Sequence, residues 1–309
     1  MLEGARIARQ GTDARRTPAL GVFVDRNFRY LVILPAVFLL LLIGLFPFVW
    51  TLVVSFQDIS LLDENTSFQG ALNYARLFHD LRLWQSIGHT LLIGAIALPI
   101  EFVLGMAMAL LFLERMPGRQ VFVALLVLPT VISPIVAGAS WRLLFDNRFG
   151  PVNQIVGWFT GEPTALLWIV SPYLVYPAIL ICEVWQWTPF MFLILLAGLS
   201  NVDPSLTEAA EIDGAGWWRT FRRIVLPAIW PVMAIALLIR ALDLFRLFDI
   251  VWALTRGGPG TMTETVSIYA YVLGFQQFET SYTAAIAVLV ILLLSLVVVL
   301  ALKRMELTR

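Results

Sequence analysis

Four ionisable residues interrupt long apolar stretches of this chain. Glu101, Glu183, Arg240 and Asp243 lie in segments that are otherwise almost uncharged. An ionisable side chain inside a membrane is costly, and it usually faces a helix-bundle interior or a water-filled path. We therefore take Glu183, Arg240 and Asp243 as candidates for contact with a polar substrate. Ion pairs that only pack helices together, with Glu101 or Glu183 neutralising Arg240, are the alternative that the sequence leaves open.

Two tryptophans next to one of these acids indicate what kind of substrate is involved. Trp185 and Trp187 follow Glu183 closely. A sugar is bound through its CH-rich ring face, which stacks on an aromatic side chain, and through hydroxyls that hydrogen-bond to carboxylates. The alternative is that both tryptophans face lipid or pack between helices. The predicted substrate pathway comprises Glu183, Trp185, Trp187, Arg240 and Asp243.

The basic residue of this set begins a ladder of alternating charge. Arg240, Asp243, Arg246 and Asp249 are spaced three residues apart, so each side chain can pair with the next one along a helix. A helix has 3.6 residues per turn, so side chains three residues apart shift progressively around its axis. The ladder therefore cannot face one lumen along its whole length.

Several kinds of chemistry are excluded by residue counts. Lys303 is the single Lys among 21 basic residues, and it lies in no glycine-rich loop, so the chain has no ATP-hydrolysing P-loop of its own. The two histidines, His79 and His89, form no His-based zinc protease motif, and Cys182 alone forms no internal disulfide. The net charge is zero, which gives no indication of nucleic-acid binding. We expect no catalytic residue, metal or cofactor in this chain.

The composition predicts the elements that position the candidate residues. The 309 residues are 60% hydrophobic with a mean hydropathy of +0.84, which indicates an all-α integral membrane protein that crosses the bilayer several times. Internal prolines predict kinked helices. Six segments are each near the length that a helix needs to cross a bilayer: Leu31–Val54, Leu91–Leu113, Val121–Trp141, Val170–Ala197, Ile229–Leu254 and Ala284–Leu302.

The distribution of basic residues predicts the orientation. Fourteen Arg and Lys residues lie in the two termini and in the loops that share their side, whereas six lie on the other side. Basic residues favour the cytoplasmic side. We expect a multi-pass protein of the cell (inner) membrane with both termini cytoplasmic, and with the loop of residues 203–227 on the cytoplasmic side as well.

The polar loop of residues 203–227 predicts two helices separated by a turn. Asp203 is a good N-cap, Pro204 suits the first helical position, and Gly214 suits a left-handed stop. A second, basic helix is expected to follow and to end at Pro227.

The same loop carries a motif. Glu208-Ala209-Ala210, then Gly214, then Ile224-x-Leu226-Pro227 resembles the EAA loop of importer-type ABC transporter permeases. In that family the loop is a cytoplasmic coupling helix that docks into a cleft of a separate ATPase subunit. The resemblance implies ATPase coupling by Glu208, Ala209, Ala210, Asp213, Gly214, Leu226 and Pro227.

A second run extends the resemblance to the carbohydrate subfamily. Phe248-Asp249 and Leu254-Thr255-Arg256-Gly257-Gly258-Pro259 are similar to residues that its members often carry. The resemblance implies the type I ABC importer permease fold, in which six transmembrane helices carry the coupling loop. It also implies an assembly with a second homologous permease, two ATPase subunits that bind ATP and magnesium, and an extracytoplasmic solute-binding protein. The expected division is a cytoplasmic tail (1–30), a first transmembrane helix with its outer loop (31–85), a transmembrane core (86–303) and a cytoplasmic end (304–309).

The predicted function is that of a permease subunit which forms half of the pathway of an ATP-driven importer for a di- or oligosaccharide. Import of glycerol phosphate or a polyol by the same fold is the alternative, and a phosphate would give Arg240 a direct role. An ion-driven secondary transporter, in which the buried charges relay protons, is a further alternative that the EAA motif argues against.

Overall fold

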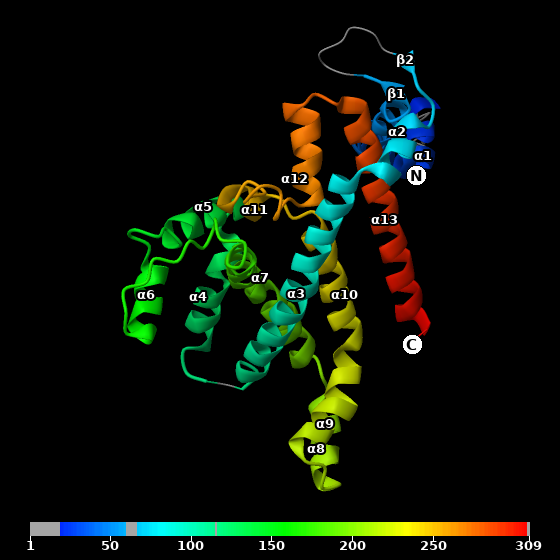
Figure 1. Ribbon diagram of the computed structural model, residues 1–309. Helices are drawn as coiled ribbons and strands as arrows, with labels where there is room; N and C mark the ends of the chain where they lie inside the picture. The colour runs from blue at the N-terminus through cyan, green and yellow to red at the C-terminus, as the bar shows by residue number, and fades with distance from the viewer. Residues whose placement is uncertain (1–18, 60–66, 115, 308–309) are drawn as a thin grey trace, which may run out of the picture. The chain divides into compact units, whose positions relative to one another are not determined.

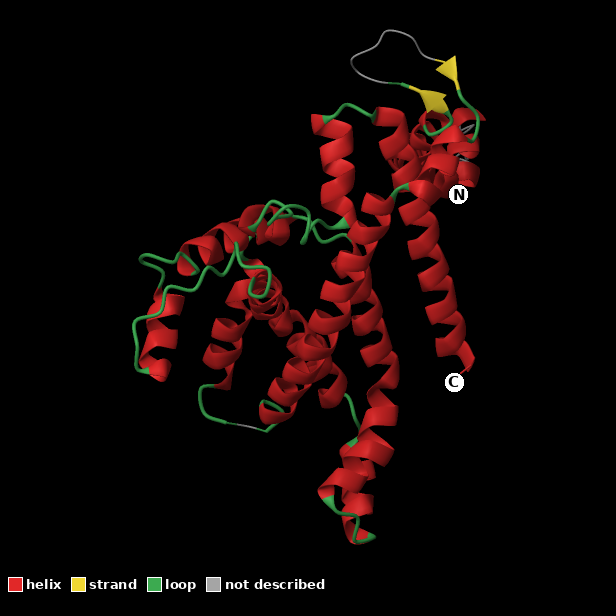
Figure 2. Ribbon diagram, viewed as in Figure 1, coloured by secondary structure: helices red, strands yellow, loops and turns green. Residues whose placement is uncertain are grey.

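The computed structural model describes residues 19–59, 67–114 and 116–307, which are almost entirely helical (Figure 2). The chain forms two compact units, residues 1–53 and residues 54–309. The first unit contains most of helix α1 (Ala19–Val54). Part of the predicted tail, residues 1–18, lies outside the described residues, but α1 already begins at Ala19, so the second part of that tail is helical. From Val32 onward α1 is long and apolar enough to cross a membrane.

The second unit is built on helices α3 (Leu81–Leu111), α7 (Val175–Ser200) and α10 (Leu226–Phe245) (Figure 1). Helices α3 and α7 approach closely at Gly105, where an added Cβ would come 2.9 Å from the backbone nitrogen of Phe192. These helices share one apolar core around Phe192.

The predicted second span was placed too late in the chain. Helix α3 begins at Leu81, because Asp80 caps it and accepts a hydrogen bond from the Leu83 backbone N–H at 3.1 Å. Helix α2 (Leu72–His79) precedes the cap, and the two-residue strands β1 (Gln57–Asp58) and β2 (Ser67–Phe68) pair antiparallel before it.

The third predicted span is not one helix. Helix α4 (Arg119–Val131) meets α5 (Pro134–Leu144) at an angle of 95°. Pro134 explains the break, since proline disfavours a helical conformation in the residue before it and removes a backbone donor. Helix α5 then packs on helix α11 (Asp249–Leu254), and Gly138 lets them approach: a Cβ there would lie 2.7 Å from that of Ala253.

The loop of residues 203–227, predicted to couple to an ATPase, forms helices α8 (Pro204–Ile212) and α9 (Trp217–Thr220), followed by a π-helical turn, η1 (Phe221–Val225). The prediction that the second helix ends at Pro227 is wrong, because η1 continues directly into α10. The Leu226 N–H bonds to the Phe221 carbonyl, five residues back. This wide turn precedes the proline and accommodates it without a break.

The fifth predicted span, Ile229–Leu254, is interrupted. Helix α10 ends at Phe245, and α11 begins at Asp249. The break is stabilised by Thr265, whose hydroxyl donates to the Leu247 carbonyl at 2.7 Å.

The remaining elements complete the chain: α6 (Pro151–Thr160), α12 (Val266–Tyr271), the π-helical turn η2 (Val272–Gln276) and α13 (Thr280–Leu307). Among the described residues, five helices are long and apolar enough to span a membrane, or six if α4 and α5 form one bent span.

Candidate functional site

A buried guanidinium joins the three central helices. Arg240 of α10 is 1% exposed and is bound by carboxylates from two neighbouring helices. Its Nε and Nη2 donate to the two oxygens of Glu101 on α3, both at 2.9 Å, and Nη2 also donates to Glu183 Oε1 on α7 at 2.9 Å. A two-pronged pair of this kind is among the stronger hydrogen-bond arrangements in proteins.

An aromatic ring covers the same guanidinium. The Trp187 ring lies 4.6 Å from the Arg240 Cζ, within the range of a cation–π contact. The buried cation therefore has carboxylate partners and an aromatic partner. Burial of an ion is tolerated only with such pairing, since an unpaired charge in the interior is strongly unfavourable.

One oxygen of this cluster has no partner among the described residues. Glu183 Oε2 is buried and makes no hydrogen bond within the described residues. The same is true of the side-chain oxygens of Gln186 and Thr188 on the same helix. Buried polar atoms are almost always hydrogen-bonded, so such an oxygen marks a place for a ligand group or a water.

A cavity of about 330 Å³ adjoins the cluster. Asp243 and Arg246 lie on it, joined by a 2.9 Å ion pair, and they are 32% and 68% exposed. Asp243 also lies 3.9 Å from Arg240. The cavity is lined by Pro134, Glu183, Trp187, Arg240, Asp243, Arg246, Leu247, Phe248, Asp249 and Ile250. It opens where α10 is interrupted, and it presents carboxylates, a guanidinium and aromatic rings to one space.

Four of the five residues predicted for the substrate pathway line this cavity: Glu183, Trp187, Arg240 and Asp243. The fifth, Trp185, does not; it is exposed, and its ring packs edge-on against Trp141 with the ring centres 5.6 Å apart. The reason is helical geometry, because Trp185 and Trp187 are two residues apart and point to different faces of α7.

Sequence reasoning missed two features of the site. The sequence left open Glu101 or Glu183 as the partner of Arg240, and it did not predict that both pair with it at once. The interruption at residues 246–248 was not foreseen, and it is what adds Phe248 to the cavity lining. The alternating ladder is real only in part: Arg240, Asp243 and Arg246 are linked, whereas no ion pair within the described residues involves Asp249.

The predicted coupling loop has the geometry of a capped helix and a glycine turn. The Asp203 carboxylate accepts the Ser205 backbone N–H at 2.9 Å, and this hydrogen bond lowers the pKa of Asp203. Gly214 adopts a positive φ of 73°, which suits glycine and strains other residues. The Ala215 N–H then bonds back to the Ala210 carbonyl at 2.9 Å.

The loop presents most of its motif residues to the exterior. Glu208, Ala209, Asp213, Gly214 and Pro227 are exposed, Leu226 is half-buried, and Ala210 is buried against the adjoining turn. Trp217 and Trp218 are 65% and 62% exposed, and a cavity of about 400 Å³ lies beside Trp217. An exposed apolar patch of this kind is typical of a docking surface.

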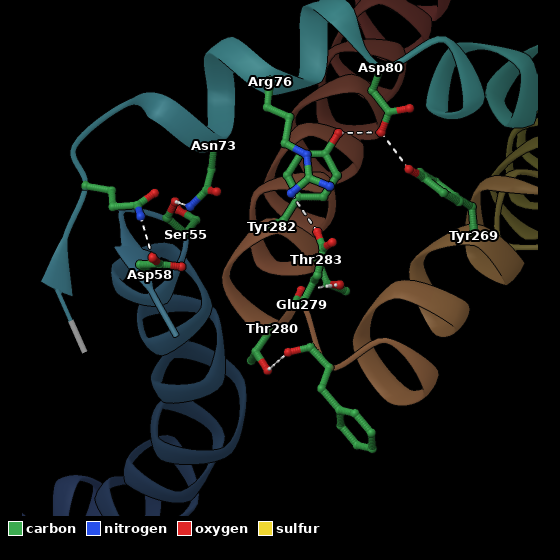
Figure 3. A network of polar contacts seen from close by, with 12 residues as sticks. Ser55, Asp58, Asn73, Arg76, Asp80, Tyr269, Glu279, Thr280, Tyr282 and Thr283 are labelled. Atoms are coloured by element: carbon green, nitrogen blue, oxygen red, sulfur yellow. Dashed lines mark hydrogen bonds and ion pairs between the residues drawn. The ribbon is translucent and has the colours of Figure 1, made fainter. Parts of the chain in front are cut away.

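A second polar cluster lies at the start of α3, away from the first (Figure 3). Asp80 Oδ2 accepts the hydroxyls of Tyr269 and Tyr282 at 2.6 and 2.5 Å. Arg76 pairs with Glu279 at 2.6 Å and lies 3.9 Å over the Tyr282 ring. This cluster joins α2 and α3 to α12 and α13, and no motif in the sequence indicated it.

The comparisons with known proteins identify the class. Residues 101–306 match the family described as "binding-protein-dependent transport system inner membrane component". The chain belongs to this family of ABC importer permeases and is a multi-pass inner membrane component of a transport system, not an enzyme.

Individual relatives are similar in sequence over most of the chain. The chain is 35% identical to the trehalose/maltose transport system permease protein MalF of Thermococcus litoralis over 80% of this chain and 83% of that protein. It is 34% identical to the trehalose transport system permease protein SugA of Mycobacterium tuberculosis over 86% and 84% of the respective chains. A solved bacterial ABC transporter involved in alginate import shares the fold, with a TM-score of 0.79 at 22% identity and coverage of 92% and 97%.

Proposed function

We propose that this chain is the permease subunit of an ATP-driven importer for a di- or oligosaccharide, and that it forms half of the translocation pathway. The observation that carries the substrate class is the cavity at the break of α10. It combines the unpartnered Glu183 Oε2, the half-exposed Asp243 carboxylate and the Trp187 ring. Carboxylates accept sugar hydroxyls, and aromatic rings stack on sugar faces. The names of the relatives, trehalose and maltose permeases, support the same class.

The hydrogen bonds that Arg240 already makes favour a sugar over glycerol phosphate as the substrate. Its Nε and Nη2 are already bound by Glu101 and Glu183, so little of the guanidinium remains to grip a phosphate from two sides. Arg246 is the exposed cation of the cavity and is already paired with Asp243. A neutral polyol fits the same groups and remains the alternative substrate.

The proposed assembly follows from the family. Two homologous permeases, two ATPase subunits that bind ATP and magnesium, and an extracytoplasmic solute-binding protein would complete the importer. In this arrangement the termini and the loop of residues 203–227 are cytoplasmic, and the exposed Glu208 would pair with a cation of the ATPase. The left-handed turn at Gly214 sets the angle between α8 and α9.

The substrate is tested on the complex reconstituted in nanodiscs with its solute-binding protein. Maltose, trehalose, longer glucosides, a polyol and glycerol phosphate are compared as stimulants of ATPase activity. We expect stimulation by a di- or oligosaccharide, and a higher concentration for half-stimulation when Asp243→Asn is introduced. Unchanged stimulation of Asp243→Asn would remove the sugar contact, and a response to glycerol phosphate alone would remove the carbohydrate assignment.

Coupling is tested by Gly214→Val, because a β-branched residue is strained at the positive φ of this turn. Apart from its two chain neighbours, no heavy atom of the described residues lies within 4 Å of the added Cβ, so the substitution acts mainly through backbone strain. We expect normal membrane abundance without uptake. Gly216→Val is the matched control, since Gly216 has an extended backbone and equally free space. Wild-type uptake by Gly214→Val would refute the coupling role.

A further inference from the structure

The segment between α5 and α7 forms an arm with a well-defined internal structure. This arm, residues 146–164, contains α6 and is fastened by Asn153, which is 3% exposed. The Asn153 amide donates to the Leu166 carbonyl at 3.1 Å and accepts from Trp168 Nε1 at 2.8 Å. Gly161, with a φ of 78°, ends the helix. Because these contacts hold the arm, its exposed side chains are presented in a fixed orientation.

The opposite face of α6 is apolar and uncovered. Ile155, Trp158 and Phe159 are 46%, 81% and 87% exposed. On a helix these positions fall on one side, and Asn153 falls on the other. Two large aromatic side chains on a rigid helix have the properties of interface anchors, which lose little conformational freedom when they bind.

The position of the arm beside the apolar helices limits which kinds of molecule can cover this face of α6. Figure 1 shows α6 level with α4, which together with α5 is apolar enough for a broken membrane span or a re-entrant loop. No ionisable residue lies between Arg148 and Glu162, and a helix of this length is too short to cross a bilayer. The arm therefore extends back to the depth of the spanning helices, where a soluble protein has no access.

The charge of Glu162 indicates whether lipid or protein covers the apolar face of α6. Glu162 follows α6 by two residues and is exposed. Lipid tails would suit Trp158 and Phe159, but an exposed carboxylate at that depth is costly without a partner. A membrane-embedded protein can offer both an apolar groove and a cation, and lipid tails cannot.

We propose that the arm clasps the second permease subunit of the importer, with Trp158 and Phe159 in an apolar groove of that subunit and Glu162 paired with one of its basic side chains. This inference rests on the two-permease assembly of the proposed function. It adds the surface by which this chain holds its partner.

The test uses the whole complex, purified through a tag on this chain and placed in nanodiscs. In a Cys182→Ala background, Phe159→Cys carries a nitroxide, and a lipid with a nitroxide on its acyl chain, added to the same nanodiscs, serves as the lipid reference. Collisions with oxygen report lipid, and collisions with a water-soluble nickel chelate report water. We expect few collisions of either kind at Phe159 and frequent oxygen collisions at the labelled lipid. Frequent oxygen collisions at Phe159 would identify lipid as the occupant, and frequent nickel collisions would identify an aqueous face; either overturns the proposal.

A second measurement follows the assembly itself. The double variant Trp158→Ala and Phe159→Ala is expected to lose most of the co-purifying second permease, whereas Tyr173→Ala, at a side chain that is 89% exposed outside the arm, is not. Full retention by the double variant contradicts the clasp but leaves the importer assignment intact. Absence of a second permease from the wild-type preparation would instead overturn the proposed assembly.

Discussion

The two polar clusters of the second unit use similar groups in different surroundings. Around Arg240, two carboxylates share one guanidinium, and all three side chains are at most 1% exposed. Around Asp80, two tyrosine hydroxyls donate hydrogen bonds to one carboxylate. The neighbouring ion pair is more exposed, with 50% of the Arg76 side chain and 35% of the Glu279 side chain accessible. We call the first set, Glu101, Glu183 and Arg240, the inner cluster, and the second set, Arg76, Asp80, Tyr269, Glu279 and Tyr282, the outer cluster. Both clusters join helices that are distant in the sequence.

The difference shows how burial changes the role of an ion pair. In the outer cluster, water reaches the Arg76–Glu279 pair, so this ion pair contributes modestly, although Tyr269 and Tyr282 themselves are buried. In the inner cluster nothing else can stabilise the charge, so the three residues must be present together or absent together. The excess of carboxylate in the inner cluster also leaves Glu183 Oε2 without a hydrogen-bond partner among the described residues, and we propose that it binds substrate there, whereas Asp80 is occupied by hydroxyls and a backbone N–H of its own chain.

The largest expected effect is that of Arg240→Met. The change leaves Glu101 and Glu183 buried without a cation, at a cost of about 3–5 kcal/mol. We expect a marked fall in membrane abundance and in the thermal unfolding temperature of the purified complex.

A compensating variant tests the reason for this loss. Arg240→Met combined with Glu101→Gln and Glu183→Gln removes all three charges together, and it should recover much of the stability without restoring transport. If Arg240→Met alone unfolds at the wild-type temperature, the inner cluster does not stabilise the fold, and the contrast with the outer cluster is lost.

The sequence predicted the inner cluster better than the outer one, for a physical reason. A charge in an apolar segment is conspicuous, and Glu101, Glu183 and Arg240 each interrupt such a segment. Asp80 lies outside the long apolar segments, and Tyr269 and Tyr282, although they lie in apolar helices, carry no charge that would mark them. Only the packing of α12 and α13 against the start of α3 brings them together.

The same reasoning explains which helix boundaries were predicted. The coupling loop was predicted in detail up to Gly214, because caps and glycine turns depend on local residues. The interruption after Phe245 depends on Thr265, which donates to the Leu247 carbonyl from a distant segment, so no local signal revealed it. The continuation through Pro227 depends on the π-helical turn η1, which the pattern of apolar residues does not show.

A smaller effect is expected for Tyr282→Phe, which removes one hydrogen bond to Asp80. A hydrogen bond to a charged group contributes about 1.5–3 kcal/mol, and we expect the lower end because the network is partly exposed. The unfolding temperature should fall measurably but by less than in Arg240→Met. Thr283→Val, which removes a hydroxyl that donates to the Glu279 carbonyl one turn back and not to Asp80, is the control.

The pH dependence of stability sharpens this prediction. Burial alone would raise the pKa of Asp80, but hydrogen bonds from Tyr269, Tyr282 and the Leu83 N–H outweigh it and lower this pKa. A lowered pKa in the folded state contributes stability above the unfolded pKa, and this contribution is lost as the pH falls through the folded value. Unfolding measured from pH 7 down to about pH 3, just below the ordinary pKa of Asp, should show a shallower acid loss in Tyr282→Phe than in wild type. An unchanged slope would mean that the tyrosine does not hold Asp80 ionised.

The smallest effect on stability is expected for Arg246→Ala, which lies beside the inner cluster but is exposed like the outer one. Its pair with Asp243 is 68% exposed on the arginine side, and surface pairs of this kind contribute about 0–1 kcal/mol. The unfolding temperature should therefore stay near that of wild type.

Because Arg246 and Asp243 both line the cavity, the change should alter the response to substrate. It frees the Asp243 carboxylate, which we propose to bind sugar hydroxyls, and it removes the cation that holds this carboxylate in place. The concentration of sugar-loaded binding protein that half-stimulates ATP hydrolysis should shift, while the fold remains intact. If Arg246→Ala destabilises the complex as strongly as Arg240→Met, exposure does not separate the two kinds of ion pair, and the proposed division between structural and substrate-facing charges fails.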